Sequence, residues 1–439
     1  MIRKTRTSDR FLYAIVVFCI FSIKISLLGA GGSSIRPDDI LIFLAFLILL
    51  LRGDMRRIER SRAFNVYLIF VAVNILSCVW NTAMGRVDPF VSAFFVVRLL
   101  QYMIFYYLGY LIARRGVDIT RMLSYYLAML CVMVPLQMVG ILSVSGISFT
   151  GIMNRAVGNT NGPYELAAVA AFLLCYLGYK QKKWIQGVVS LLLVFLTAAR
   201  ITSVAAVFSV AKIAILRRTK SRRGFILGVA SLVAAGIIGV VAAPYISSST
   251  SNQQIAIFRR LSSVTSTGIS YDTLSKAYEA APVYVRYTDY LEGEFTNSTE
   301  QVGATEGDRS GLYRVFRWTT LIKSTLNGFD TTLIGLGPSF GWTAVDGYYV
   351  RVFTETGVLG LLVFCWFAKA LLFRGDGSLW AFREYAFMLL ATGCFVDIFV
   401  SYKPMLLLWL WHGMNQFNLK NKPYENDVPN LKLSEEIET

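Results

Sequence analysis

Five arginines and two carboxylates are the residues of this sequence whose types could do chemistry together. A guanidinium group stays charged and binds phosphate through two parallel hydrogen bonds, so a set of arginines suits a diphosphate ligand. Asp346 and Glu165 are the candidate bases for taking a proton from a hydroxyl group. The arginines are Arg98, Arg155, Arg200, Arg314 and Arg317.

Histidine and cysteine add little to this set. His412 is the only histidine, which excludes a multi-histidine metal site and a histidine base elsewhere in the chain. The six cysteines lie inside apolar blocks and do not predict a disulfide framework. Asp38 and Asp39 open an apolar block, where helix capping competes with a metal-dependent transferase as their role. Because arginines can neutralise the charge, we expect no metal and no other cofactor.

These residues must be held in a very apolar framework. The chain has 439 residues, of which 55% are hydrophobic and 16% are charged. Soluble globular proteins carry about 25% charged residues, so the composition excludes two ordinary soluble domains, a disordered protein and a disulfide scaffold. The net charge of +16 does not indicate nucleic acid, because most basic residues sit in short bursts between apolar blocks.

Twelve apolar blocks predict an all-α fold, a polytopic membrane helix bundle of about twelve spans. A signal peptide is the alternative for the first block, but its removal would leave an odd number of spans. Residues 184–216 would form a helix of about 50 Å, too long for one crossing, so we expect a break near Thr197–Thr202. The blocks cover approximately 11–28, 38–52, 63–80, 90–112, 121–142, 164–179, 184–198, 201–216, 224–245, 347–373, 384–401 and 404–418.

Charge asymmetry orients the predicted spans. With the N-terminus in the cytosol, each short inside segment carries two to five Lys and Arg residues, and no short outside segment carries more than one. Both termini are therefore expected in the cytosol, and Arg200 at the outer face. The chain then divides into spans one to nine (1–245), an extracytoplasmic loop domain (246–346), spans ten to twelve (347–418) and a cytosolic tail (419–439).

The other arginines also belong to the outer half of this layout. Arg155 precedes the sixth span, and Arg314 and Arg317 share one face of a predicted loop helix. For these three, the alternative is an exposed cation without a role. Arg98 lies about 12 Å inside the fourth span, where an ion pair with Glu355 would be an alternative, structural role.

The carboxylates have structural alternatives as well. Asp346 lies where the outer loop meets the tenth span, and an N-cap of that helix is the alternative role. Glu165 opens the sixth span, where it could serve only as a first-turn acid. Asp397, in the outer half of the eleventh span, is unusual enough to be a functional candidate.

The predicted layout restricts the chemistry. The longest inside loop has about ten residues, and no P-loop or dinucleotide fingerprint is present. An enzyme with this layout would act outside, where an activated sugar has to arrive on a lipid such as a polyprenyl pyrophosphate. That substrate needs cations at the outer interface, an apolar slot for the prenyl chain and a base for the acceptor hydroxyl.

Three stretches together resemble the O-antigen polymerase and ligase superfamily of membrane glycosyltransferases. Residues 196–200, ending in Arg200, are similar to its Ser-Arg hairpin, with Ala199 in place of the usual serine. The sequences RVFRW (314–318) and GLGPSF (335–340) resemble its Arg-x-x-x-Trp helix and Gly-x-Gly turn. Residues 346–360 resemble its loop exit, which usually ends in Glu-x-Gly-x-x-Gly.

The resemblance implies a polymerase of lipid-linked oligosaccharide units in a bacterial plasma membrane. The donor would be a growing glycan on undecaprenyl pyrophosphate, and the acceptor a single repeat unit on a second carrier lipid. The arginines would hold the pyrophosphate, and Asp346 or Glu165 would take the acceptor's proton, with inversion at the anomeric centre. Membrane lipid and a regulator of chain length are the other candidate partners, whereas nucleic acid is not expected.

Two alternatives stay open. Ligases of the superfamily carry a histidine-asparagine pair where this chain has Asp346-Gly347, which favours a polymerase over a lipid A–core ligase. A flippase or transporter of lipid-linked sugars should show internal repeats and polar residues at the bilayer midplane. No repeat is visible in the sequence, and most of the candidate residues crowd the outer face.

Overall fold

The computed structural model describes ten stretches of the chain, and these stretches contain helices and irregular connections but no strand. The all-helical class predicted from the sequence is therefore confirmed for the part of the chain that is described. The stretches are residues 7–23, 36–138, 141–142, 156–197, 199–216, 275, 278–292, 309–341, 345–373 and 379–421.

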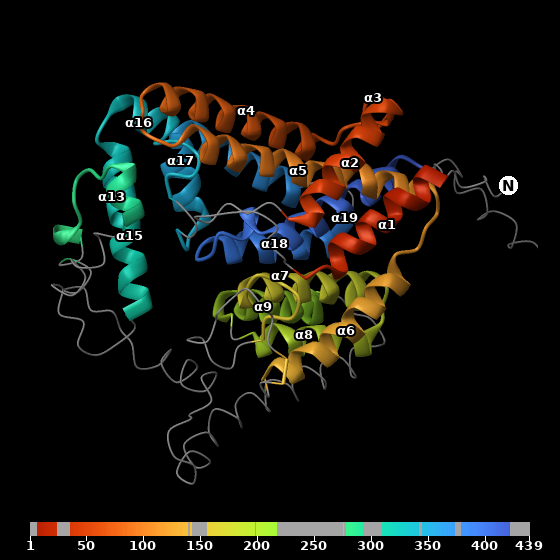
Figure 1. The fold of residues 1–439 in the computed structure, drawn as a ribbon. Coiled ribbons are helices and arrows are strands. Elements are labelled where there is room, and N and C mark those ends of the chain that lie inside the picture. The colour runs from red at the N-terminus through yellow and green to blue at the C-terminus, as the bar shows by residue number, and fades with distance from the viewer. Residues whose placement is uncertain are drawn as a thin grey trace, which may run out of the picture.

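Three of the described helices are long and apolar enough to cross a membrane, which suggests a membrane protein. They are α4 (Arg62–Ala83), α5 (Pro89–Arg114) and α17 (Tyr348–Leu372). Proline at the first turn of α5 and the Asp88 side chain, which accepts the Val91 N–H at 2.9 Å, fix where that helix begins. In Figure 1, α4 and α5 run side by side along one edge of the molecule.

Further helices fill the bundle, with α18 and α19 in the middle and α6 to α9 on the side away from α4 (Figure 1). Together with the three long helices, they coincide with eleven of the predicted blocks, while the ninth block, 224–245, lies outside the described residues. The number of membrane crossings stays a prediction. These elements are α1 (Thr7–Phe21), α2 (Pro37–Leu51), α3 (Asp54–Arg57), α6 (Thr120–Met138), α7 (Pro163–Leu173), a π-helix η1 (Leu174–Lys180), α8 (Trp184–Leu196), α9 (Arg200–Leu216), α18 (Trp380–Gly393) and α19 (Tyr402–Lys420).

Helices α5 and α19 approach one another very closely through glycine. A Cβ atom at Gly109 would lie 2.0 Å from the Leu410 carbonyl oxygen, and one at Gly413 would lie 2.0 Å from the Tyr106 carbonyl oxygen. Small residues at such crossings are typical of helices that associate in lipid, where close backbone contact replaces hydrophobic driving force. This contact fixes α19 at the centre of the bundle.

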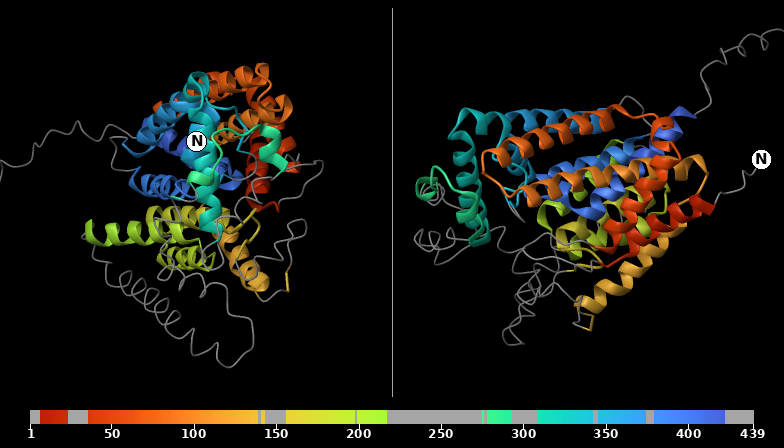
Figure 2. Two further views of the ribbon diagram at one scale, coloured as in Figure 1. Left: turned by 90° about the vertical axis from the view of Figure 1, so that its left-hand side faces the viewer. Right: turned by 45° about the horizontal axis from the view of Figure 1, so that its top comes forward.

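Three helices lie at one end of the bundle, away from α1 and α3 (Figure 1). They are α13 (Tyr287–Glu292), α15 (Arg309–Leu326) and α16 (Phe329–Ile334). Seen from that end, in the left view of Figure 2, α15 lies across the ends of the other helices. Beneath α15 is a small apolar core of its own, formed by Val87, Leu321, Leu336, Phe340 and Val345.

The structure tests two local expectations. The expected break near Thr197–Thr202 is confirmed, because α8 ends at Leu196 and α9 begins at Arg200. The eleventh block was expected to be helical as far as residue 401, and this is wrong, because α18 ends at Gly393. Residues 394–401 form an irregular connection that contains one short 3-10 helix, η3 (Ile398–Val400).

Candidate functional site

The connection between α18 and α19 carries a buried carboxylate that joins three parts of the chain. Asp397 Oδ2 accepts the backbone N–H of Val345 at 2.7 Å and that of Asp346 at 3.3 Å. The same oxygen lies 3.2 Å from Nη2 of Arg351 in α17. Asp397 lies outside a regular helix, and its carboxylate joins residues 345–346 to α17. This corrects its expected place inside a span.

Arg351 is the most deeply buried cation of this region, with 1% of its surface exposed. Its guanidinium lies between Asp397 and Glu355, whose Oε1 is 3.6 Å from Nη1, and it sits 5.4 Å from the centre of the Phe95 ring. Reasoning from the sequence missed Arg351 and favoured Arg98 as the partner of Glu355. The position of Arg351 in an apolar helix could have indicated its importance, because a cation there is costly unless it faces partners inside the bundle.

Asp346 lies beside this buried pair at the surface of the site. Its Oδ2 is 3.7 Å from Nη2 of Arg314 in α15, and its side chain is 38% exposed. Burial raises the pKa of the Asp346 carboxyl above its ordinary value and the Asp397 charge adds to this, while Arg314, Arg317 and Arg351 act in the opposite direction. The structure thus places Arg314 beside Asp346, and the charge of Arg317 also acts on this carboxyl.

The backbone around Asp346 is held by Trp318 of α15. The indole Nε1 donates to the Val345 carbonyl at 2.9 Å, and a Cβ atom at Gly347 would lie 2.7 Å from the indole ring. Asp346 has a left-handed φ of 59°, and Gly347 rather than Asp346 occupies the N-cap position of α17. The capping alternative for Asp346 is therefore wrong, and its side chain is turned to the arginines instead.

Helix α17 is broken two residues after Glu355, next to the buried charges. Gly357 has a φ of 66°, which interrupts the helix. The N–H groups of Leu336 and Gly337 donate to the Thr354 and Glu355 carbonyls at 2.7 and 3.2 Å, and the Ser77 hydroxyl donates to the Glu355 carbonyl at 2.7 Å. The glycine turn after α16 thus satisfies carbonyls freed by the break, a requirement inside an apolar bundle.

Arg200 and Arg98 are on helices that reach the same connection. Arg200 is the first residue of α9, and two residues later the Thr202 hydroxyl lies 3.0 Å from that of Thr392, at the end of α18. Arg98 is on α5, where it lies 5.1 Å from the centre of the Phe94 ring. One turn further along α5, the Tyr102 hydroxyl donates to the Val400 carbonyl at 2.7 Å.

Arg155, the remaining arginine of the predicted set, lies outside the described residues. The described arginines are thus carried on α5, α9 and α15, and all three helices meet the α17–α18–α19 end of the bundle.

Glu165 is placed differently from Asp346. It is 4% exposed, and its two oxygens accept the backbone N–H groups of Asn161 at 2.7 Å and Lys403 at 2.9 Å. The Lys403 ammonium in turn donates to the carbonyls of Ile20, Ser22 and Asn159 at 2.9 to 3.0 Å. This geometry fits the first-turn role and joins the beginnings of α7 and α19. Each carboxylate oxygen of Glu165 therefore already accepts one backbone N–H.

Asp39, from the other acidic pair, and His412 both contact neighbouring groups of the fold. Asp39 Oδ2 accepts the backbone N–H of Arg36, the N-cap residue of α2, at 2.9 Å. His412 is buried, and its Nε2 lies 2.6 Å from the Ser61 hydroxyl. Among the described residues, no three His, Cys, Asp or Glu side chains gather where they could hold a metal ion.

The described residues thus form a helical bundle with three helices long and apolar enough to cross a membrane and a charged cluster at one end. No protein-family model matches the chain, and no curated protein matches its sequence. Any functional assignment therefore rests on the residues and their geometry.

Proposed function

We propose that this chain is a glycosyltransferase that polymerises lipid-linked oligosaccharide units on the outer face of a bacterial plasma membrane. The observation that supports it best is the half-buried Arg314–Asp346 pair beside the buried Arg351–Asp397 pair. Cations and a carboxylate of raised pKa then share one end of an apolar bundle. A lipid diphosphate with a sugar acceptor needs these groups at a membrane interface.

In the proposed reaction, a hydroxyl oxygen of the acceptor sugar attacks the anomeric carbon of the donor's first sugar. The bond between that carbon and the pyrophosphate oxygen breaks, and the lipid pyrophosphate leaves from the opposite face, which inverts the anomeric centre. Asp346 takes the hydroxyl proton. Arg314 and Arg317, with Arg200 from α9, stabilise the charge that grows on the leaving diphosphate.

The proposal includes the topology expected from the sequence: twelve spans, cytosolic termini and residues 246–346 as an outer domain. The described helices α13, α15 and α16 of that region lie together over one end of the bundle, which agrees with this arrangement. A ligase is the nearest alternative, and a flippase or transporter is the alternative from another class. The absence of a visible internal repeat in the sequence favours an enzyme over a transporter.

The test uses the purified full-length protein with synthetic undecaprenyl pyrophosphate repeat units, in the presence of a chelator. A ladder of products on a gel is expected from a polymerase. A single transfer that requires a different acceptor would indicate a ligase, and movement of the lipid without a new glycosidic bond would indicate a flippase.

Variants then assign the roles. We expect Arg314→Ala, Arg200→Ala and Asp346→Asn to lose most of the ladder, since each removes a group proposed to act on charge or proton. Arg286→Ala is the matched control, because Arg286 is an exposed cation of the same outer region. Near-normal ladders from the Arg314 and Asp346 variants would remove the proposed site.

A further inference from the structure

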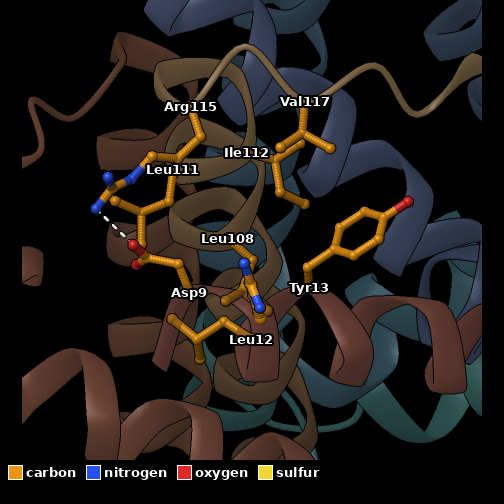
Figure 3. Close-up of a pocket in the computed structure, with 9 residues that line it drawn as sticks. Asp9, Leu12, Tyr13, Leu108, Leu111, Ile112, Arg115 and Val117 are labelled. Atoms are coloured by element: carbon orange, nitrogen blue, oxygen red, sulfur yellow. Dashed lines mark ion pairs between the residues drawn. The ribbon is translucent and has the colours of Figure 1, made fainter. Parts of the chain in front are cut away.

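A partly open cavity lies at the other end of the bundle (Figure 3). Helix α5 starts near α16 and reaches this cavity at Leu108, 19 residues after Pro89, a rise of about 29 Å. The cavity has a volume of about 140 Å³. Its walls are almost entirely apolar and come from Leu12 and Tyr13 of α1, Leu108 and Ile112 of α5, and Val117 in the following turn.

The rim of this cavity is charged. Asp9 forms ion pairs with both Arg115 and Arg52, and Arg52 also lies 2.9 Å from Asp54. Figure 3 shows the Asp9–Arg115 pair at one edge of the cavity. Arg10 also lines the cavity and is exposed. The charged residues that line the cavity are Asp9, Arg10 and Arg115, with a net formal charge of +1, so the rim attracts anions.

Further arginines near the cavity add to the positive charge at this end of the bundle. Arg56, Arg57 and Arg114 are exposed at the same end of the bundle, on α3 and at the end of α5. Clusters of arginine beside apolar helices mark the cytoplasmic side of a membrane protein. Anionic lipids of the cytoplasmic leaflet are drawn to basic sites of this kind between helices.

We propose that this cavity binds one anionic phospholipid of the cytoplasmic leaflet. An acyl chain lies against the α1–α5 wall, and the phosphate lies at Arg10 and Arg115. The apolar wall explains why the occupant is a lipid, and the net positive rim explains why its headgroup is anionic. The choice of leaflet rests on the orientation in the proposed function, but the site does not depend on the catalysis, because it lies at the opposite end of α5.

The experiment measures lipid binding to the full-length protein in detergent by native mass spectrometry. Phosphatidylglycerol and phosphatidylcholine with identical acyl chains are titrated separately. Arg10→Gln/Arg115→Gln removes the charge at the rim, whereas Val117→Trp fills the cavity and keeps every charge. Arg56→Gln/Arg57→Gln is the matched control, because it removes the same charge from exposed positions outside the cavity.

We expect one phosphatidylglycerol to bind in preference to phosphatidylcholine. The rim variant should weaken that binding about tenfold or more, because two cations near the headgroup are lost. Val117→Trp should weaken binding of both lipids, and the control should change little. Thermal unfolding identifies any variant that fails to fold. If the rim variant does not fold, the lipid binding of Val117→Trp tests the proposal.

Three outcomes would overturn the proposal. Equal binding of the two lipids would remove the anionic selectivity, and equal losses in the rim variant and its control would indicate only a diffuse surface charge. Native affinity in Val117→Trp would show that lipid does not occupy the cavity.

Discussion

Asp346 allows catalytic and structural roles to be separated by experiment. Burial raises its pKa above 3.8, so the folded protein binds this proton more tightly than the unfolded chain does. The stability contributed by such a carboxyl is present at low pH and is lost as the pH rises through the folded-state pKa. Asparagine stays neutral and tolerates the left-handed backbone at this position.

We therefore expect Asp346→Asn to unfold near neutral pH at the same temperature as the native protein or slightly above it, while losing activity. In the native protein, a base must be ionised, so activity should fall on the acid side with a pKa above 3.8. Thermal unfolding checks the expected stability of the variant, and a pH–rate profile checks the expected loss of activity of the native protein at acid pH. A clear loss of stability at neutral pH would make Asp346 a structural residue.

The Arg351–Asp397 pair leads to a different expectation, because both side chains are buried. Removing one partner of a buried pair leaves an uncompensated charge and costs about 3–5 kcal/mol. We expect Arg351→Met to destabilise the protein by this amount in a reversible unfolding experiment. Arg351→Met/Asp397→Asn should recover part of the loss, since the second change removes the stranded charge. Fully additive losses would show that the two residues are not coupled.

At the scale of elements, the break in α17 depends on Gly357. It has a φ of 66°, and a Cβ atom there would lie 2.4 Å from the Leu333 backbone. Gly116 offers a matched control, because its φ is 68° and a Cβ atom there would meet nothing within 4 Å. Gly116→Ala should cost about 1–2 kcal/mol from the left-handed backbone alone. Gly357→Ala should cost clearly more and reduce activity, as measured by unfolding and the ladder assay. Equal costs would contradict the close packing of α16 on the break.

Sequence reasoning succeeds here where the signal is local. Apolar blocks gave helix positions, and the length of 184–216 predicted the break before Arg200, because a helix has a fixed rise for each residue. The sequence placed Arg314 on a loop helix and Asp346 at the loop exit, and their contact appears only in the structure. Asp397 was misplaced because its partners Val345 and Arg351 are far away in sequence, and no local pattern encodes such contacts.

At the scale of the whole molecule, the two ends of the bundle differ in how their charged residues are arranged. One end holds carboxylates and arginines in close pairs beneath α15, and the other carries exposed arginines around an apolar cavity. Three of the described helices between them are long and apolar enough to cross a membrane. The proposed function requires the first end to face outwards, since its substrate arrives on a lipid there.

That orientation gives a prediction that does not depend on catalysis. Met84, at the end of α4 near the site, and Arg57, on α3 at the other end, are both exposed. In a variant without native cysteines, Met84→Cys should react with a membrane-impermeant thiol reagent in spheroplasts. Arg57→Cys should react only after the membrane is broken. The reversed pattern would place the charged cluster in the cytosol, where nucleotide sugars are available, and a lipid-linked donor would no longer be required.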